Sequence, residues 1–158
     1  MVDDENFMRR CLELARIALE NGDAPVGALI VSSGEIISEG IESVKSKLDP
    51  TAHAEIEAIR AACEKFNTLD LSGATLYTNV EPCVMCAFAI RQTGIRIVVF
   101  GISNNKVGGA NSKFAVLADA DFPAKFAPPE IRAGVLSEEC ENLFQDFQQV
   151  SQKGCRLS

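Results

Sequence analysis

The sequence has one histidine, His53, and no tryptophan among its 158 residues. A structural zinc site of the two-cysteine, two-histidine type therefore lacks its second histidine. Six cysteines are present. A metal site in this chain has at most one imidazole ligand, and its other ligands must come from cysteine or carboxylate side chains.

Basic residues are in the minority, with 15 lysines and arginines against 22 aspartates and glutamates and a formal net charge of −7. On average such a surface does not attract a polyanion, although a local basic groove is compatible with this balance. No apolar run approaches the ~20 residues that span a bilayer. The first six residues are acidic and polar, unlike a signal peptide, so we expect a cytoplasmic protein with reduced cysteines and no membrane partner.

The composition is that of an ordinary globular protein, with 47% hydrophobic and 23% charged residues. The sequence contains no internal repeat, low-complexity segment or recognisable linker, and its length suffices for a substantial core. We therefore expect a single domain over residues 1–158.

Two short stretches carry the residues that suit catalysis. His53-Ala54-Glu55 offers an imidazole and a carboxylate, and Pro-Cys-Val-Met-Cys at residues 82–86 offers two thiolates. One histidine and two cysteines suit a tetrahedral Zn²⁺ whose fourth position stays open for water, as in catalytic zinc sites. Glu55 lies close enough in sequence to move protons from that water. We predict His53, Cys83 and Cys86 as zinc ligands and Glu55 as the catalytic residue.

Each of these features has a simpler interpretation when it stands alone. The histidine could be a helix-start residue without a function, and a Cys-x-x-Cys pair could be half of a structural zinc knuckle or a redox pair. The combination of one histidine, a nearby glutamate and Pro-Cys-x-x-Cys, each at a predicted helix start, favours the catalytic zinc site.

Hydrophobic periodicity predicts alternating strands and helices. Helices are expected over residues 6–20, from Pro50 or Thr51, from Pro82, at residues 114–117 and from Ser137. Strands are expected over residues 28–31, 35–39, 74–80, 95–100 and 131–136, with loops over residues 40–49, 101–112 and 122–129. This alternation predicts a three-layer α/β fold with a mixed sheet. His53 and Glu55 would lie in the first turn of one helix, and Cys83 and Cys86 near the start of another.

Two phrases in the sequence resemble those of a known family. Asp-Pro-Thr-Ala-His-Ala-Glu-Ile at residues 49–56 and Glu-Pro-Cys-Val-Met-Cys-Ala at residues 81–87 resemble the cytidine deaminase superfamily, and within it the tRNA adenosine deaminases. The resemblance extends over residues 25–147. It implies a three-layer α/β/α cytidine-deaminase-like fold with about five strands, hydrolytic loss of ammonia from an amino-substituted heteroaromatic ring, and a homodimer.

The resemblance also implies substrate contacts. The backbone near Ala54 and Cys83 would contact the attacking water, and the carbonyl oxygen of Glu81 would hold the leaving amino group. Val26 and Glu42 would contact the substrate. At the position of Glu42 related deaminases commonly carry an asparagine, which donates and accepts hydrogen bonds, whereas an ionised glutamate only accepts. If Glu42 faces the pocket, we therefore predict that it favours a base edge with two adjacent donors. The alternative is that Glu42 points to water, as most loop glutamates do.

The net negative charge, Glu42 and a weakly basic C-terminal segment lead us to expect a free nucleobase or nucleoside, similar to isocytosine, cytosine or guanine, as substrate. We expect Phe144 and Phe147 to belong to the core rather than to a stacking platform for RNA. tRNA is the disfavoured partner, although the loop over residues 104–112 resembles that of the tRNA enzymes. Conversion of adenosine to inosine in tRNA is the alternative function, and a catalytically idle zinc-binding partner subunit is the alternative of another class.

Overall fold

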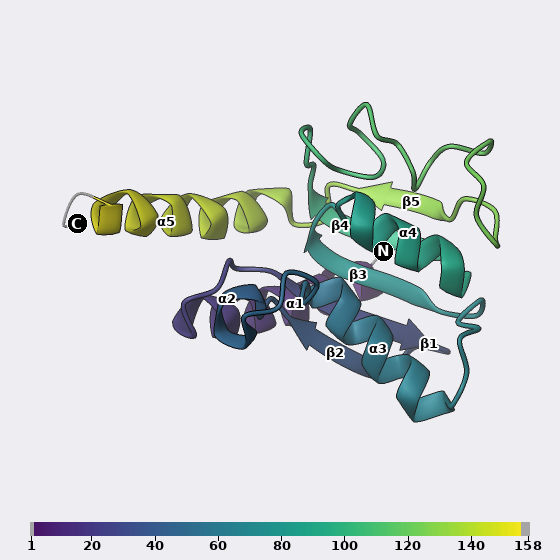
Figure 1. Cartoon of the computed structure of the whole chain (residues 1–158). Helices are drawn as coiled ribbons and strands as arrows, with labels where there is room; N and C mark the ends of the chain where they lie inside the picture. Colours follow the sequence, from purple (N-terminus) through teal and green to yellow (C-terminus); the bar gives the residue numbers. More distant parts are fainter. Residues whose placement is uncertain (1, 156–158) are drawn as a thin grey trace.

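The computed structural model describes residues 2–155 and shows a five-stranded sheet with helices on both faces (Figure 1). In chain order the elements are α1 Val2–Glu20, β1 Gly27–Ser32, β2 Glu35–Ile41, α2 Val44–Lys47, α3 Ala54–Phe66, β3 Thr75–Val80, α4 Val84–Thr93, β4 Ile97–Ile102, β5 Glu130–Ala133 and α5 Ser137–Cys155. The strand order is β2-β1-β3-β4-β5, in which β1 pairs antiparallel with β2 and β3, while β3, β4 and β5 are parallel. The predicted three-layer α/β/α architecture with a mixed sheet is confirmed.

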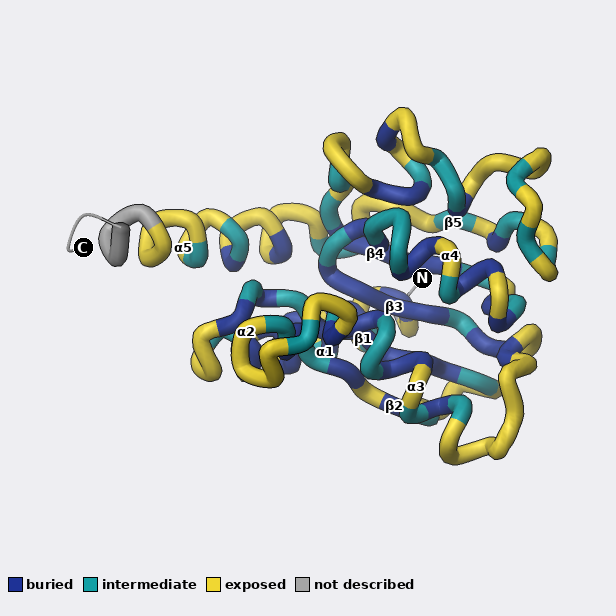
Figure 2. Tube along the Cα trace, in the orientation of Figure 1, coloured by how far each residue is buried: buried dark blue, intermediate teal, exposed yellow. Residues whose placement is uncertain are grey.

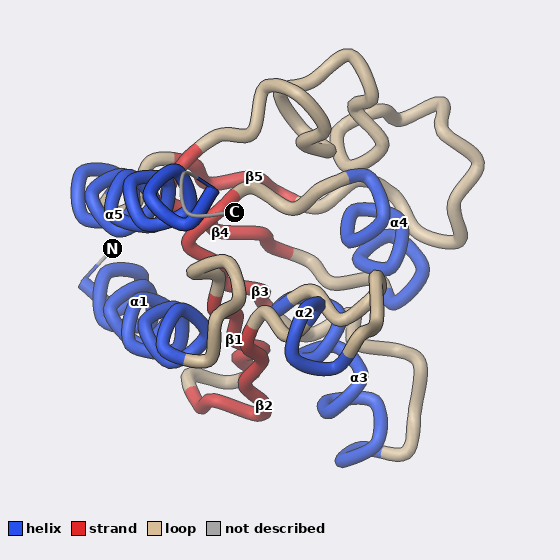
Figure 3. Tube along the Cα trace, turned by 60° about the vertical axis from the view of Figure 1, so that its left-hand side comes forward, coloured by secondary structure: helices blue, strands red, loops and turns tan. Residues whose placement is uncertain are grey.

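The two faces of the sheet bury different residues, because successive side chains of a strand point to opposite sides. On β1, Ala28 and Ile30 pack into the core beneath α3 and α4, whereas Leu29 and Val31 pack into the core beneath α1 and α5. Figure 3 shows α1 and α5 side by side over one face and α3 and α4 over the other. The two cores share one sheet, and the predicted zinc ligands belong to the α3 and α4 side.

Helix α5 packs on the body of the protein only through its first part. Cys140 and Leu143 are buried in the core beneath α1 and α5, whereas Val150 is 65% exposed, and the helix projects beyond the sheet (Figures 1 and 2). Phe144 lies between these two regions and is half-buried. In the described part of the chain, no helix combines the length and the apolar character needed to cross a membrane.

Several predicted boundaries near the ligands are wrong for local reasons. Helix α3 begins at Ala54 rather than at Pro50 or Thr51, because Asp49 accepts hydrogen bonds from the backbone N and the hydroxyl of Thr51 and so stabilises a turn. Helix α4 begins at Val84, so Pro82 precedes the helix. The expected loop over residues 40–49 contains the one-turn helix α2.

Two further predictions fail on the way to α5. Residues 114–117 form no helix. A turn at residues 116–118 presents the carbonyl oxygens of Val116 and Asp119 to the buried guanidinium of Arg91, which binds both. Strand β5 is shorter than expected and shifted towards the N-terminus. It ends at Ala133, since Gly134 turns the chain with a φ of 85°.

Strand β2 approaches the start of α3 unusually closely. A Cβ atom at Gly40 would lie 2.1 Å from the carbonyl oxygen of Ala54 and 2.6 Å from the backbone N of Ala58, so only glycine fits there. On the same strand, the hydroxyl of Ser38 donates a hydrogen bond to the carbonyl oxygen of Ala58. These contacts fix the first turns of α3, which carry Glu55.

Candidate active site

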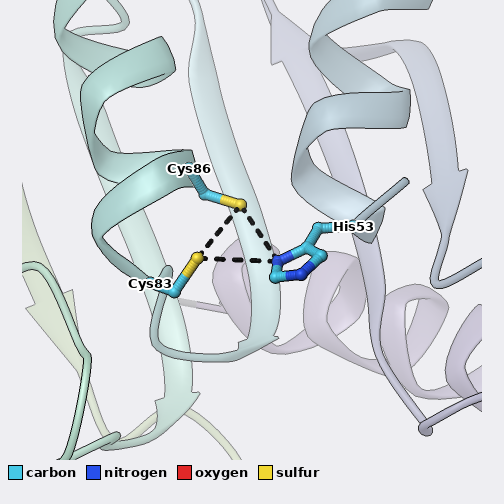
Figure 4. A group of neighbouring side chains, drawn as sticks. All are labelled: His53, Cys83 and Cys86. Atoms are coloured by element: carbon cyan, nitrogen blue, oxygen red, sulfur yellow. Dashed lines mark hydrogen bonds between the residues drawn. The ribbon is translucent and has the colours of Figure 1, made fainter. Parts of the chain in front are cut away.

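The side chains of His53, Cys83 and Cys86 converge between the starts of α3 and α4 (Figure 4). His53 Nδ1 lies 3.5 Å from each of the two Sγ atoms, which lie 3.8 Å from one another. A tetrahedral zinc ion with Zn–S bonds of about 2.3 Å and a Zn–N bond of about 2.0 Å requires nearly these separations. The three side chains therefore fit Zn²⁺ as a set, with the two sulfurs and one nitrogen already at ligand spacing.

Two helix N-caps bring these ligands together. His53 and Cys83 are the N-cap residues of α3 and α4, both with extended backbone, and their carbonyl oxygens accept the first helical hydrogen bonds, from the backbone N of Glu57 and Ala87. Cys86 lies in the first turn of α4, so the spacing of three residues places both sulfurs on the same side of the helix. His53 was expected inside the first turn of its helix and lies directly before it.

Glu55 is buried in the first turn of α3, next to the ligands. Its Oε2 lies 3.6 Å from Cys86 Sγ, and its Oε1 lies 3.4 Å from the hydroxyl of Thr78, which is a long contact. Burial raises the pKa of Glu55 to about 7, because the charged form loses hydration. The carboxyl therefore lies beside the cluster in an environment that lets it bind and release a proton near neutral pH.

The protonation of the ligands is also shifted. A hydrogen bond with Cys86 and a further one with His53 lower the pKa of Cys83 to about 4. The hydrogen bond with Cys83 raises the pKa of His53 to about 9. The pKa of Cys86 is raised by its hydrogen bond with Cys83 and by burial. Without metal, the site thus pairs one thiolate with an imidazolium, while the second thiol keeps its proton.

A small cavity of about 190 Å³ opens at this cluster. Six of the predicted site residues line it: Val26, Glu42, His53, Glu55, Glu81 and Cys83. Glu42 is only 9% exposed, and its Oε2 accepts a hydrogen bond from the backbone N of Ala54 at 3.3 Å. The structure therefore brings the predicted ligands and predicted substrate contacts to one place.

The loop over residues 101–112 was expected to form the rim of a pocket, but the sequence did not indicate which residues of the outer wall contact the cavity. Asn104 and Val107, from the loop after β4, and Phe144, from α5, complete the lining. We expected Phe144 in the core, and this prediction is wrong, because α5 leaves the sheet at this point and its ring is half-buried beside the cavity. Phe147 is likewise half-buried, with its ring 6.0 Å from Lys45 Nζ.

Comparison with known proteins places these features in context. Residues 1–102 match the family model of the cytidine and deoxycytidylate deaminase zinc-binding region. The chain is 46% identical over 138 residues to the tRNA-specific adenosine deaminase of Aquifex aeolicus, which covers 85% of this chain and 91% of that protein. It is 41% identical over 145 residues to the tRNA-specific adenosine deaminase of Haemophilus influenzae, covering 91% and 82% of the two chains.

The fold is similar to that of a solved structure, with a TM-score of 0.82 and 34% sequence identity. That structure comes from a study of A-to-I editing by tRNA:A34 deaminases at the wobble position of transfer RNA. The match covers 87% of this chain and 98% of that chain. The cytidine-deaminase-like fold and the zinc cofactor predicted for His53, Cys83 and Cys86 are thereby confirmed.

The same relatives overturn two expectations. A free nucleobase or nucleoside as substrate, and tRNA as a disfavoured partner, were wrong, since the similar proteins are specific for tRNA. Both expectations depended on Glu42, on the net charge and on the weakly basic C-terminal segment. One oxygen of Glu42 is already used by the backbone of Ala54, so this carboxylate is not a free pair of acceptors. Net charge averages over the whole surface and does not describe one pocket.

When the zinc-free protein binds one Zn²⁺ at pH 8, we expect the ligands to release about two protons, and the water that the ion acidifies to release up to one more. His53, with a pKa of about 9, and Cys86, with a raised pKa, must each lose a proton, whereas Cys83, with a pKa of about 4, has already lost its own. Glu55 is mostly ionised at this pH and contributes little. Calorimetric titration in two buffers of different ionisation enthalpy gives the number, and release of one proton or none would contradict these protonation states.

Proposed function

The chain belongs to the cytidine and deoxycytidylate deaminase zinc-binding family and is a zinc-dependent aminohydrolase, and we propose that it converts adenosine to inosine in tRNA. The observation that carries this proposal is the similarity, over most of both chains, to proteins named for this activity. The solved structure with the same fold comes from enzymes that edit adenosine 34, so we propose the wobble position as the target.

The surroundings of the cavity support an RNA substrate. A groove of about 600 Å³ between the loop after β4 and α5 shares Val80, Asn104 and Phe144 with the zinc cavity. Amide side chains of Asn105, Gln145 and Gln148 also line it. Bases splayed out of an RNA loop stack on aromatic rings and form hydrogen bonds with such amides. A nucleotide chain that places one base in the cavity has room to continue along this groove.

Deamination of adenosine replaces the amino group on C6 with an oxygen from water and releases ammonia. His53, Cys83 and Cys86 would hold the zinc ion, which would acidify a bound water and lower its pKa towards about 7. Glu55 takes a proton from the water, delivers it to the ring nitrogen N1 and then helps to protonate the departing amine. Its pKa of about 7 suits a group that must both accept and donate a proton in one cycle.

The remaining predicted residues have supporting roles in this proposal. The carbonyl oxygen of Glu81 accepts a hydrogen bond from the leaving amino group, and the backbone of Ala54 contacts the attacking water. Val26 borders the base in the cavity. Glu42 has one oxygen on the backbone N of Ala54, and its other oxygen is available for a donor of the substrate. Because N1, N3 and N7 of adenosine are acceptors, that donor is its amino group or a ribose hydroxyl.

We also propose that the protein is a single cytoplasmic domain that forms a homodimer. Both cores share one sheet, which supports a single domain. On α4, Phe88 is 42% exposed, and its ring lies 6.1 Å from the ring of the partly exposed Phe122. Aromatic side chains exposed in one region are typical of a surface that another subunit covers.

The substrate is tested by offering the zinc-loaded protein a tRNA with adenosine at position 34, and separately guanine, cytosine, isocytosine, cytidine and adenosine. We expect inosine in the tRNA, read as guanosine after reverse transcription, and rates on the small molecules lower by about 100-fold or more, since remote binding energy is lost with the rest of the tRNA. A tRNA with guanosine at position 34 is the control. Ammonia released from a free base, with no inosine formed in tRNA, would contradict the proposal.

The Glu55→Gln variant tests the proton transfer. We expect it to keep one zinc per chain and to lose kcat by about 100- to 10,000-fold, because the amide cannot carry the proton. Glu57→Gln, two residues along the same helix, is the matched control and should remain active, since Glu57 pairs with Lys47 and Arg60 away from the ligands. Metal analysis measures the zinc content of each variant, and single-turnover assays measure its rate of deamination. A near-normal rate for Glu55→Gln would show that another group moves the proton.

A further inference from the structure

The carboxylate of Glu81 binds the loop after β4. Glu81 is 1% exposed. Its Oε1 accepts hydrogen bonds from the backbone N of Ala110 at 2.8 Å and of Asn111 at 2.7 Å. Its Oε2 accepts hydrogen bonds from the backbone N of Asn104 at 2.8 Å and from Asn111 Nδ2 at 3.0 Å. These four N–H donors satisfy a carboxylate, which only accepts, and tie both ends of residues 104–111 to one side chain.

The same loop is joined to the backbone around the zinc ligand Cys83. The backbone N of Val84 donates to the carbonyl oxygen of Val107 at 3.0 Å, and the backbone N of Gly109 donates to the carbonyl oxygen of Pro82 at 2.8 Å. Cys83 and Gly108, which lie between these two hydrogen bonds, are paired as an isolated antiparallel β-bridge. The loop therefore runs directly beside a ligand of the metal.

The fit around the carboxylate leaves no spare room. A Cβ atom at Gly108 would lie 2.3 Å from Glu81 Oε1 and 2.3 Å from the carbonyl oxygen of Asn104. A glycine is needed at this close approach, so loop and carboxylate fit one another in a single arrangement.

This loop forms the wall of the cavity that faces α5. Asn104 and Val107 line the zinc cavity, and residues 103–106 line one side of the groove that continues past Phe144. The position of the loop therefore sets the shape of the space where the substrate must lie.

We propose that Glu81 is a positioning residue, whose carboxylate holds residues 104–111 against the start of α4 so that Asn104 and Val107 form the substrate wall. The choice of tRNA as the assayed substrate rests on the proposed function. A wall that touches the substrate equally in the ground state and in the transition state contributes uniform binding, so its loss raises KM and leaves kcat nearly unchanged.

The Glu81→Gln variant separates this role from a general effect on folding. It keeps the size of the side chain but replaces one acceptor oxygen by an amino group. This amino group is itself a donor and cannot accept hydrogen bonds from the N–H groups of the loop. We expect KM for the tRNA substrate to rise by about 10-fold, kcat to stay within about 3-fold, and zinc to remain at one per chain. Amide hydrogen exchange should accelerate at Asn104, Ala110 and Asn111, and not in β3 or α3. Glu64→Gln, on the exposed end of α3, is the control and should change none of these values.

A milder variant guards against failure of Glu81→Gln to fold. Asn111→Ala removes one of the four hydrogen bonds to the carboxylate and leaves the backbone donors in place. We expect it to raise KM in the same direction, by about 3-fold. Unchanged KM and unchanged loop exchange in a folded variant would overturn the positioning role, as would a fall in kcat at constant KM. If the unmodified protein forms no inosine in tRNA, the proposed function fails instead, and the exchange measurement still decides whether Glu81 holds the loop.

Discussion

Helices α3 and α4 begin next to one another, and the three zinc ligands lie at these two N-termini. The rest of the site depends on the spacing of these ligands. His53 and Cys83 each occupy an N-cap, and Cys86 follows one turn into α4, so the ligand positions are set by where two helices begin. The sheet fixes those beginnings. Glycine at position 40 lets β2 approach α3, and parallel pairing of β3 with β4 directs α4 back over the same face. The ligand spacing near 3.5 Å follows from this packing.

Two buried carboxylates near the zinc ligands differ in how strongly they are hydrogen-bonded, and this difference suits them to different roles. Glu81 is surrounded by four N–H donors at 2.7–3.0 Å, which hold it in one position. Glu55 has two long contacts, at 3.4 and 3.6 Å, and burial raises its pKa to about 7. A carboxylate that is fully bonded suits a structural support, whereas one that is buried with weak partners suits proton transfer.

The parts of the molecule that depend on local spacing could be predicted from the sequence. Periodicity gave the strands and most helices, and the intervals from His53 to Glu55 and from Cys83 to Cys86 gave the zinc ligands and the neighbouring acid. The parts that depend on distant contacts could not. The bonds of Glu81 reach residues up to 30 positions away, and Phe144 reaches the cavity only because α5 leaves the sheet beside the loop after β4. The substrate prediction was wrong for the same reason. The hydrogen bond between Glu42 and the backbone of Ala54 is a distant contact, and the net charge does not say where on the surface the charges lie.

X-ray absorption at the zinc edge of the purified protein tests the convergence of His53, Cys83 and Cys86 most directly. If these three side chains hold the ion, the spectrum shows two sulfur neighbours at about 2.3 Å and lighter neighbours at about 2.0 Å, one of them an imidazole nitrogen. A shell of four sulfur neighbours, a shell without sulfur, or protein that binds no zinc would contradict the site.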